Sequence, residues 1–317
     1  MMQFSLNVWS EEFSSMNDRW SNIAWNPALA LQPKRHFLLG QCSRFRTGGS
    51  ADLFFEVGCL RDLIVLLHTL PEDCAVHTTG LGSNTLFRDN GFRGAVIRLI
   101  GDFQSCRFYG STVDVGAGCS TRKLARQAQT LGLGGLEFLD GIPGTVGGSV
   151  CMNAGAFGRD MSDVVVEVQV VTRSGHIKHF APEQLCFEYR KSQLPPNVII
   201  IGARLAASCG EPAAIAERMA CMDAERRSYQ PIKARTCGST FKNPPGYSAR
   251  RLIADAGLQD LRAGGARLAA QNCNFIIAEG RCKSADVEKL GQQVRCGVRQ
   301  AFGVELEWEI RIVGDAA

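Results

Sequence analysis

Hydrophobic residues recur with two different periods along this chain, one typical of strands and one typical of helices. Alternating apolar residues predict a strand over residues 51–57, and a leucine-rich stripe at helical spacing predicts a helix over residues 60–67. Similar patterns predict further strands over residues 74–79, 94–99, 112–115, 164–172, 177–180, 198–206 and 274–278. The mixture of both element types indicates an α+β fold.

More helices are expected where apolar residues repeat every three to four positions. Ser120 is a suitable N-cap for a helix that Gly132 can end. A further helix is predicted over residues 211–228, and a short one passes through Leu252 and Ile253. A long helix follows, and Gly303 should end it. The apolar stripe of this helix consists of Val287, Leu290, Val294 and Val298.

Two of the predicted strands alternate with unusual regularity. The strand over residues 164–172 should carry four valines on one face, namely Val164, Val166, Val168 and Val170. The last strand, over residues 305–313, should bury Leu306, Trp308, Ile310 and Ile312. Its other face would then carry Glu305, Glu307, Glu309 and Arg311. Taken alone, this charged face is more typical of a solvated strand than of a catalytic site.

Length and composition are those of a globular protein. A chain of 317 residues, 45% hydrophobic and 21% charged, is long enough for two or three domains. No apolar run has the length of a membrane span, so no membrane association is expected. The formal net charge of +4 is small and scattered, which favours small anionic ligands over nucleic acid. The N-terminus does not resemble a secretory signal, which predicts a cytoplasmic location.

The cysteines and histidines do not suggest a metal site. Thirteen cysteines are present without a C-x-x-C pair, and they are typical of reduced core residues. His176 and His179 form an H-x-x-H pattern, but residues three apart on a strand point to opposite faces. We therefore predict that the protein holds no metal.

The segment over residues 134–158 contains eight glycines. Glycine allows positive φ and close approach of other groups, but it costs conformational entropy, so this density suggests a task. The amides and small side chains of residues 144–149 could surround a nucleotide diphosphate or a flavin ring. A loop-rich connection is the alternative explanation.

A second glycine-containing turn, GLGSN over residues 80–84, follows a predicted strand. Gly80 and Gly82 allow the amides to converge on an anion, and Ser83 and Asn84 add side-chain donors. The turn lacks the third glycine of a G-x-G-x-x-G dinucleotide fingerprint. An ordinary tight turn is therefore the alternative.

Six motifs follow one another along the chain. They are TGGSAD at residues 47–52, GLGSN at 80–84, the glycine-rich segment at 134–158, YR at 189–190, CGSTFKNP at 237–244 and EIRIVG at 309–314. In this order they resemble the UDP-N-acetylenolpyruvoylglucosamine reductases, flavoenzymes of bacterial peptidoglycan precursor synthesis. The resemblance covers roughly residues 38–314.

The resemblance implies FAD bound between two N-terminal subdomains of the vanillyl-alcohol-oxidase (PCMH) type. A C-terminal α+β domain would close over a nucleotide sugar. The resulting division is an N-terminal extension at residues 1–30, FAD-binding subdomains at 31–100 and 101–209, and a substrate-binding domain at 210–317. The FAD should be non-covalent, because no histidine lies within residues 78–165 to tether it. NADPH would be the co-substrate, UDP-N-acetylglucosamine enolpyruvate the substrate, and the protein a monomer.

The motifs also carry the family's functional residues. The implied catalytic residues are Arg190, Ser239 and Glu309, and the implied substrate contacts are Lys242 and Asn243. The implied FAD contacts are Gly80, Gly82, Ser83, Asn84, Gly141, Ile142, Pro143, Gly144, Thr145, Gly147, Gly148, Asn153 and Gly155.

The family reaction gives each catalytic residue a task. Hydride from the reduced flavin would reach the terminal methylene of the enolpyruvyl ether, and negative charge would develop toward the carboxylate. Arg190 would stabilise that charge as an always-protonated donor. Ser239 would protonate the adjacent carbon, with Lys242 as a candidate neighbour that stabilises the alkoxide. Glu309 would be a proton-transfer partner.

The sequence departs from the family pattern at two positions. Asn272 stands where many relatives carry histidine, and Tyr229 stands where a lysine often precedes Gln-Pro. The contacts to the uridine diphosphate are therefore open. The short chain after Arg190 resembles the subtype without an extra substrate-covering loop. The alternatives are a flavin oxidase of the same fold and a nucleotide-sugar-binding protein without turnover.

Overall fold

The computed structural model describes Trp20, residues 23–26 and residues 31–315. The N-terminal extension predicted for residues 1–30 therefore lies mostly outside the described residues. Trp20 itself is buried, and its indole Nε1 donates a hydrogen bond to Asp52 Oδ2 at 3.0 Å. Within the described ranges, no helix has the length and apolar character needed to cross a membrane.

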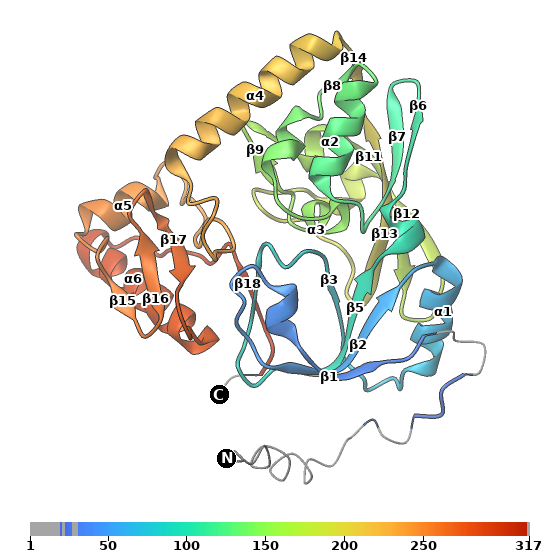
Figure 1. Cartoon of the computed structure of the whole chain (residues 1–317), viewed down its shortest axis with the longest axis horizontal. Coiled ribbons are helices and arrows are strands. Elements are labelled where there is room, and N and C mark those ends of the chain that lie inside the picture. Colours follow the sequence, from blue (N-terminus) through green and yellow to red (C-terminus); the bar gives the residue numbers. More distant parts are fainter. Residues whose placement is uncertain (1–19, 21–22, 27–30, 316–317) are drawn as a thin grey trace, which may run out of the picture.

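The first sheet has the strand order β1-β2-β5-β3 and forms the lower part of the molecule in Figure 1. β1 (Lys34–Leu38) pairs antiparallel with β2 (Ser50–Val57). β5 (Phe92–Leu99) runs parallel to both β2 and β3 (Val76–Thr79). The helix predicted after β2 is α1 (Leu60–Thr69), and its stripe is buried at Leu63, Leu66 and Leu67.

The second sheet is antiparallel throughout, with the order β12-β11-β13-β7-β6. Its strands are β6 (Cys106–Tyr109), β7 (Thr112–Gly116), β11 (Val165–Thr172), β12 (Ile177–Phe180) and β13 (Val198–Ala206). Buried residues of both sheets belong to one continuous hydrophobic cluster. We call the part built on the first sheet the first unit and the part built on the second sheet the second unit. Their shared core fixes these two N-terminal units against each other.

The alternation predicted for β11 is wrong at one position. Three of the four valines are buried, but Val166 is 42% exposed. The pairing of β11 with β13 shifts register between Val165 and Glu167, which marks a β-bulge. A bulge adds one residue to one strand, so residues on either side of it no longer alternate as the sequence pattern implies.

Two helices in this half are capped by hydroxyl side chains. Ser120 Oγ accepts a hydrogen bond from Lys123 N at 3.1 Å, which confirms the predicted N-cap of α2 (Thr121–Thr130). Thr145 caps α3 (Val146–Cys151) in the same way. Shorter elements connect these parts. They are the 3-10 helices Leu39–Cys42, Gly101–Gln104, Glu137–Gly141, Met161–Asp163 and Pro182–Leu185, and the strands β8 (Leu133–Gly134), β9 (Gly155–Ala156), β10 (Arg159–Asp160) and β14 (Ser208–Cys209).

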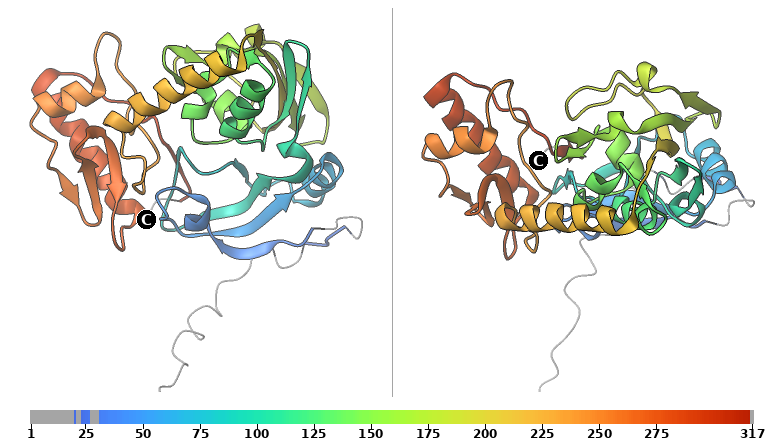
Figure 2. Two further views of the ribbon diagram at one scale, coloured as in Figure 1. Left: turned by 45° about the horizontal axis from the view of Figure 1, so that its top comes forward. Right: turned by 90° about the horizontal axis from the view of Figure 1, so that it is seen from above.

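α4 (Pro212–Tyr229) leads from the second sheet to a C-terminal unit, as Figures 1 and 2 show. Ile215 and Met219 of α4 are buried in the large N-terminal cluster. The C-terminal unit has a hydrophobic cluster of its own, which also includes Phe45 and Leu86 of the first unit. Its elements are α5 (Ala249–Asp255), β15 (Arg262–Ala263), β16 (Ala266–Ala269), β17 (Asn272–Ala278) and α6 (Ser284–Phe302).

The end of the chain returns to the first unit. β18 (Arg311–Val313) pairs in parallel with β4 (Thr85–Phe87), directly after the GLGSN turn. The predicted strand over residues 305–313 is therefore too long. Residues 305–310 do not belong to a strand, and Glu307, Trp308 and Glu309 pair instead with the loop over residues 240–242. Leu306 and Ile310 are nevertheless buried as the alternation predicts.

Candidate active site

A cavity of about 920 Å³ lies where the two N-terminal units and the C-terminal unit meet. This volume is typical of sites that bury a cofactor or a substrate. Most of the residues assigned from the sequence line it, namely Gly80, Gly82, Ser83, Asn84, Gly141, Ile142, Pro143, Gly144, Thr145, Gly147, Gly148, Gly155, Arg190, Ser239, Asn243 and Glu309. Asn153 and Lys242 do not line it.

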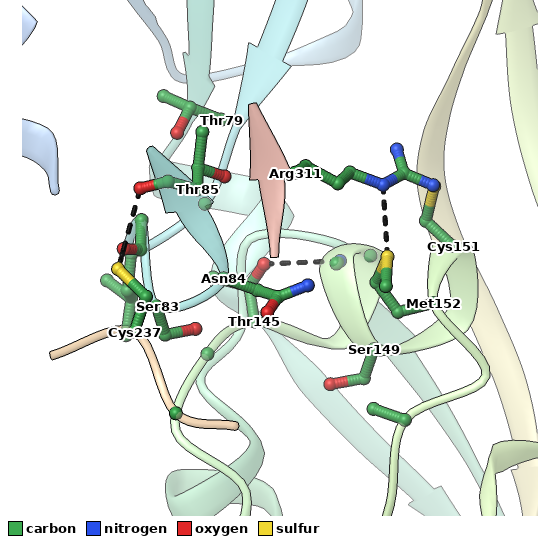
Figure 3. Close-up of a pocket in the computed structure, with 18 of the residues that line it drawn as sticks. Thr79, Ser83, Asn84, Thr85, Thr145, Ser149, Cys151, Met152, Cys237 and Arg311 are labelled. Carbon is green, nitrogen blue, oxygen red and sulfur yellow. Dashed lines mark hydrogen bonds between the residues drawn. The ribbon is translucent and has the colours of Figure 1, made fainter. Parts of the chain in front are cut away.

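The GLGSN turn and the glycine-rich segment interlock in the cavity wall. Ser83 Oγ donates a hydrogen bond to Pro143 O at 2.5 Å. A Cβ on Gly80 would lie 2.5 Å from Thr145 Oγ1, the atom that accepts from Gly148 N. Only glycine therefore lets the turn approach the cap of α3 so closely. Figure 3 shows Ser83, Asn84 and Thr145 around this part of the cavity.

Several backbone amides in this wall have no hydrogen-bond partner among the residues that the structure describes. Within the described ranges, the amides of Leu81, Gly82 and Ser83 make no hydrogen bond, and neither do those of Gly144 and Thr145. Gly82 is in the left-handed region with φ 57°. Unpaired amides in a glycine turn form a concave donor set that suits a phosphate or diphosphate.

Arg190 is held by three groups. Its Nη2 donates to Gly155 O at 2.9 Å, and its Nε donates to Glu309 Oε1 at 3.2 Å. Its guanidinium carbon lies 4.9 Å from the ring centre of Tyr189. The backbone of Arg190 is in the left-handed region with φ 57°, a conformation that costs a non-glycine residue about 1 kcal/mol or more. A strained backbone with an oriented cation is typical of a functional position.

Glu309 is a half-buried carboxyl group whose side chain is 17% exposed. Burial raises the pKa of Glu309, while the positive charges of Arg190 and Lys242 oppose the rise. Its backbone is fixed from both sides, because Asn84 Nδ2 donates to Glu309 O at 3.0 Å and Glu309 N donates to Thr240 O at 2.8 Å. The carboxyl is thus held in a place where it can exchange a proton.

Ser239 lies on a loop over residues 237–243 that β17 anchors. Thr240 N donates to Asn274 O at 2.7 Å, and Asn274 Nδ2 donates to Phe241 O at 2.9 Å. The loop also pairs with the Glu309 segment through the bond just described. In the part of the chain that the structure describes, the hydroxyl of Ser239 has no hydrogen-bond partner of its own. It is half-buried and lines the cavity.

Cys237 connects this loop to the first unit. Its thiol donates to Gly82 O at 3.4 Å and to Thr85 O at 3.5 Å, a contact visible in Figure 3. Burial raises the pKa of Cys237 to about 11, so the group stays a neutral thiol. It is therefore a packing contact between the two units and not a nucleophile.

The two predicted substrate contacts differ in their surroundings. Asn243 Oδ1 accepts a hydrogen bond from Ala249 N at 2.9 Å, at the start of α5, and the residue lines the cavity. Lys242 Nζ instead forms an ion pair with Glu307 Oε2 at 3.2 Å. Lys242 would have to leave Glu307 to meet a ligand in the cavity.

The cavity wall includes cationic residues that the sequence did not single out. Arg226, in the last turn of α4, lines the cavity together with Tyr229 and Asn272, the two departures from the family pattern. Burial and the charges of Arg122 and Arg44 lower the pKa of Arg226. Mutual repulsion of this kind favours an anionic ligand. Helical spacing alone gives no signal for such a cluster.

Arg311 and His77 are two further polar residues of the wall. Arg311 Nε lies 3.0 Å from the sulfur of Met152, and Figure 3 shows this contact between two lining residues. The alternation of the last segment placed Arg311 beside Glu309 but assigned it no role. His77 is half-buried, and its desolvation together with the nearby charge of Arg311 lowers its pKa to about 4, so it is neutral at pH 7.

Two family models match the chain. Residues 51–181 match a model described as an FAD binding domain, and residues 230–313 match the C-terminal domain of UDP-N-acetylenolpyruvoylglucosamine reductase. The first match covers both glycine-containing segments of the cavity. The unpaired amides there fit the diphosphate of FAD, and FAD is the cofactor.

Known relatives cover most of the chain. The UDP-N-acetylenolpyruvoylglucosamine reductase of Paramagnetospirillum magneticum is 46% identical over 85% of this chain and 88% of its own length. That of Acidiphilium cryptum is 44% identical over 87% of this chain and 89% of its own length. The crystal structure of the Thermus caldophilus reductase superposes with a TM-score of 0.78 at 36% identity, covering 89% of this chain and 99% of that one. The predicted α+β fold class is confirmed, and the chain belongs to the UDP-N-acetylenolpyruvoylglucosamine reductase family.

Proposed function

We propose that this chain reduces the enolpyruvyl ether of UDP-N-acetylglucosamine enolpyruvate to UDP-N-acetylmuramate with electrons from NADPH. One observation supports this most directly. Arg190, Ser239 and Glu309 come from three distant segments and line the same cavity as the unpaired amides that fit FAD. A site for the cofactor and a set of acid, base and cation for the substrate are thus combined in one volume.

FAD, held by the amides of the GLGSN turn and of the glycine-rich segment, would supply the hydride that the terminal methylene of the enolpyruvyl group needs. Arg190 stabilises the negative charge that then develops on the carboxylate side of the substrate, because its guanidinium is already oriented by Gly155 and Tyr189. Ser239 donates the proton that the adjacent carbon needs, so one hydride and one proton convert the double bond to a single bond. The hydroxyl of Ser239 suits this task, since no group in residues 31–315, Trp20 or residues 23–26 must first release it.

Glu309 has a role that follows from its burial and its partner. A carboxyl whose pKa is raised holds a proton more readily near neutral pH. When the substrate carboxylate pairs with Arg190, Glu309 loses its counter-charge and its protonation is favoured further. We propose that Glu309 helps to return a proton to the hydroxyl of Ser239 after each turnover.

The diphosphate of the nucleotide sugar requires positive charge and donors. Asn243 and Arg226 line the cavity, and Lys242 lies just outside it on the same loop as Asn243. We assign the diphosphate to these residues, with Tyr229 and Asn272 taking the places of the family lysine and histidine.

We also propose that the protein acts as a monomer in the cytoplasm. All thirteen cysteines are free thiols, as expected for a protein of a reducing compartment. Size-exclusion chromatography with light scattering tests the oligomeric state.

The test of the function is product analysis. The purified holoprotein is incubated with NADPH and the enolpyruvyl nucleotide sugar, and the products are separated and weighed by mass spectrometry. We expect a nucleotide sugar heavier by two hydrogen atoms, formed in proportion to the NADPH consumed. NADPH consumption without this product, or none at all, would contradict the proposal.

A further inference from the structure

Asn153 is a residue of the glycine-rich segment that the sequence assigned to FAD, yet it does not line the cavity. It is 2% exposed and directly follows Met152, the C-cap residue of α3. Its backbone is left-handed with φ 41°, a conformation that asparagine tolerates better than most residues and that often ends a helix. The position therefore selects asparagine for its backbone as well as for its amide.

The side-chain amide of Asn153 uses both of its ends. Its Oδ1 accepts a hydrogen bond from Ser162 N at 3.0 Å. Its Nδ2 donates to Asp160 Oδ2 at 3.1 Å and to Glu188 O at 3.0 Å. A fully paired buried amide fixes the segments that it joins, because each bond would be costly to lose.

One of these bonds reaches the turn that carries Arg190. Glu188 and Lys191 pair with each other and close a tight turn whose two central residues are Tyr189 and Arg190. The carbonyl oxygen that Asn153 holds belongs to Glu188, two positions before Arg190. The amide of Asn153 thus fixes the base of this turn.

A second route from Asn153 to Arg190 runs along the backbone. Two residues after Asn153, the carbonyl oxygen of Gly155 accepts the bond from Arg190 Nη2. A Cβ on Gly155 would lie 3.0 Å from Arg190 Nη1, so the guanidinium packs tightly on this segment. Asp160, which also accepts a hydrogen bond from Asn153, pairs with Gly155 between β10 and β9. Asn153 is therefore bonded to Glu188 at the start of the Arg190 turn and to the strand partner of the glycine that holds the guanidinium.

We propose that Asn153 is a positioning residue that holds Arg190 where the substrate carboxylate must meet it. This inference rests on the proposed function, and it moves Asn153 from the cofactor contacts to the catalytic support. A misplacement of about 1 Å costs roughly 100-fold in rate. Asn153 therefore affects the reoxidation of the flavin by the substrate, which is the half-reaction that uses Arg190. It leaves the reduction of the flavin by NADPH unchanged.

The test separates the two half-reactions in Asn153→Ala. Stopped-flow absorbance follows flavin reduction by NADPH and then flavin reoxidation by the enolpyruvyl substrate. Reoxidation should slow on the order of 10- to 100-fold, whereas reduction and FAD affinity should stay within about 3-fold of the parent. Weakened FAD binding with normal reoxidation of the loaded fraction would restore Asn153 to the cofactor contacts and overturn the proposal.

A double-mutant cycle tests whether Asn153 acts through Arg190. In the Arg190→Ala background, Asn153→Ala should change the reoxidation rate by less than about 3-fold, because the group that it positions is gone. The same slowing in both backgrounds would show that Asn153 acts independently of Arg190, and it would overturn the proposal.

Two further variants control for folding. Asn153→Asp keeps the acceptor for Ser162 N but loses the donor to Glu188 O, so it should be as slow as Asn153→Ala. Reoxidation of Asn153→Asp at the parent rate would contradict the role of the Glu188 bond. Val168→Ala removes buried volume from the core without touching this network and should lower stability but not the reoxidation rate. If the substrate does not reoxidise the flavin of the parent protein, the proposed function and the role of Asn153 both fail. If the substrate reoxidises the parent and Asn153→Ala at the same rate, only the role of Asn153 fails.

Discussion

Arg190 and Glu309 are 119 positions apart in the chain, and Nε of the arginine lies 3.2 Å from Oε1 of the glutamate. Their side chains are only 20% and 17% exposed. The pair joins the turn of the second unit to the segment that returns from the C-terminal unit. In the proposed function, a substrate carboxylate that binds Arg190 competes with Glu309, which would couple substrate binding to the protonation of Glu309.

The raised pKa of Glu309 predicts a pH dependence of stability. A carboxyl that holds its proton more tightly in the folded state contributes stability below its ordinary value of 4.5, and this contribution is lost as the pH rises through the raised value. The amide of Glu309→Gln does not titrate, so this variant does not lose stability in that pH range. Its free energy of unfolding should therefore increase relative to the parent as the pH rises from 4.5.

Urea unfolding at a series of pH values measures this difference. Glu305→Gln is the matched control, because Glu305 is 53% exposed on the same segment. We expect the control to follow the parent. A constant difference between Glu309→Gln and the parent at all pH values would show that the pKa of Glu309 is not raised by folding.

Ser239→Ala should separate the two half-reactions. In the proposed mechanism the hydroxyl has no part in hydride transfer from NADPH, so flavin bleaching should keep the parent rate. Reoxidation by substrate should slow on the order of 100- to 10,000-fold, the usual contribution of a general acid. Ser239→Cys should recover part of the rate, because a thiol can still donate a proton. An alanine variant that reoxidises at the parent rate under saturating substrate would remove Ser239 from the mechanism.

Lys242→Ala should raise the Michaelis constant for the nucleotide sugar more than that for NADPH, with turnover largely intact. The matched control is Glu307→Gln, which frees Lys242 from its ion pair without removing its charge. The control should bind the nucleotide sugar at least as well as the parent. Steady-state kinetics with each substrate varied in turn provides both constants. An equal effect of Lys242→Ala on both substrates would indicate a structural role.

Gly82→Ala should yield a less stable protein that is poor in flavin. A Cβ at this left-handed position would collide with the carbonyl oxygen of Cys42. A loss of more than about 1 kcal/mol of stability is expected. Gly58→Ala is the control, because a Cβ there meets nothing within 4 Å. Thermal unfolding and the ratio of flavin to protein absorbance measure both effects. A flavin-replete, fully stable Gly82→Ala would contradict the tight turn.

Local patterns were sufficient for the elements that carry their own signal. β13 has the predicted bounds of residues 198–206, and α6 buries its predicted stripe and ends at Gly303 in the left-handed region. In these elements the burial period and the end signals lie within the segment itself. The bulge in β11 was not predictable, since it depends on the register with β13.

The site was predictable through its motifs and not through its contacts. Most of the residues that the motifs assigned do line the cavity, but the motifs did not single out Arg226 or assign a role to Arg311. The pairing of Glu309 with Arg190 and the loop that pairs with the segment over residues 305–310 are non-local contacts, which local patterns do not encode. Asn153 shows the limit most clearly. Its place in a glycine-rich motif suggested a ligand contact, whereas its hydrogen bonds connect it to the turn of Arg190. Sequence alone does not reveal which wall a buried amide faces.

The spectrum of the bound flavin tests the central claim most directly. The purified protein should show the absorbance of oxidised FAD, and acid precipitation should release the colour, because the cofactor is expected to be non-covalent. Under exclusion of oxygen, NADPH should bleach this absorbance, and addition of UDP-N-acetylglucosamine enolpyruvate should restore it. A flavin that NADPH bleaches but that the enolpyruvyl substrate leaves reduced, or a protein that takes up no FAD, would contradict the account.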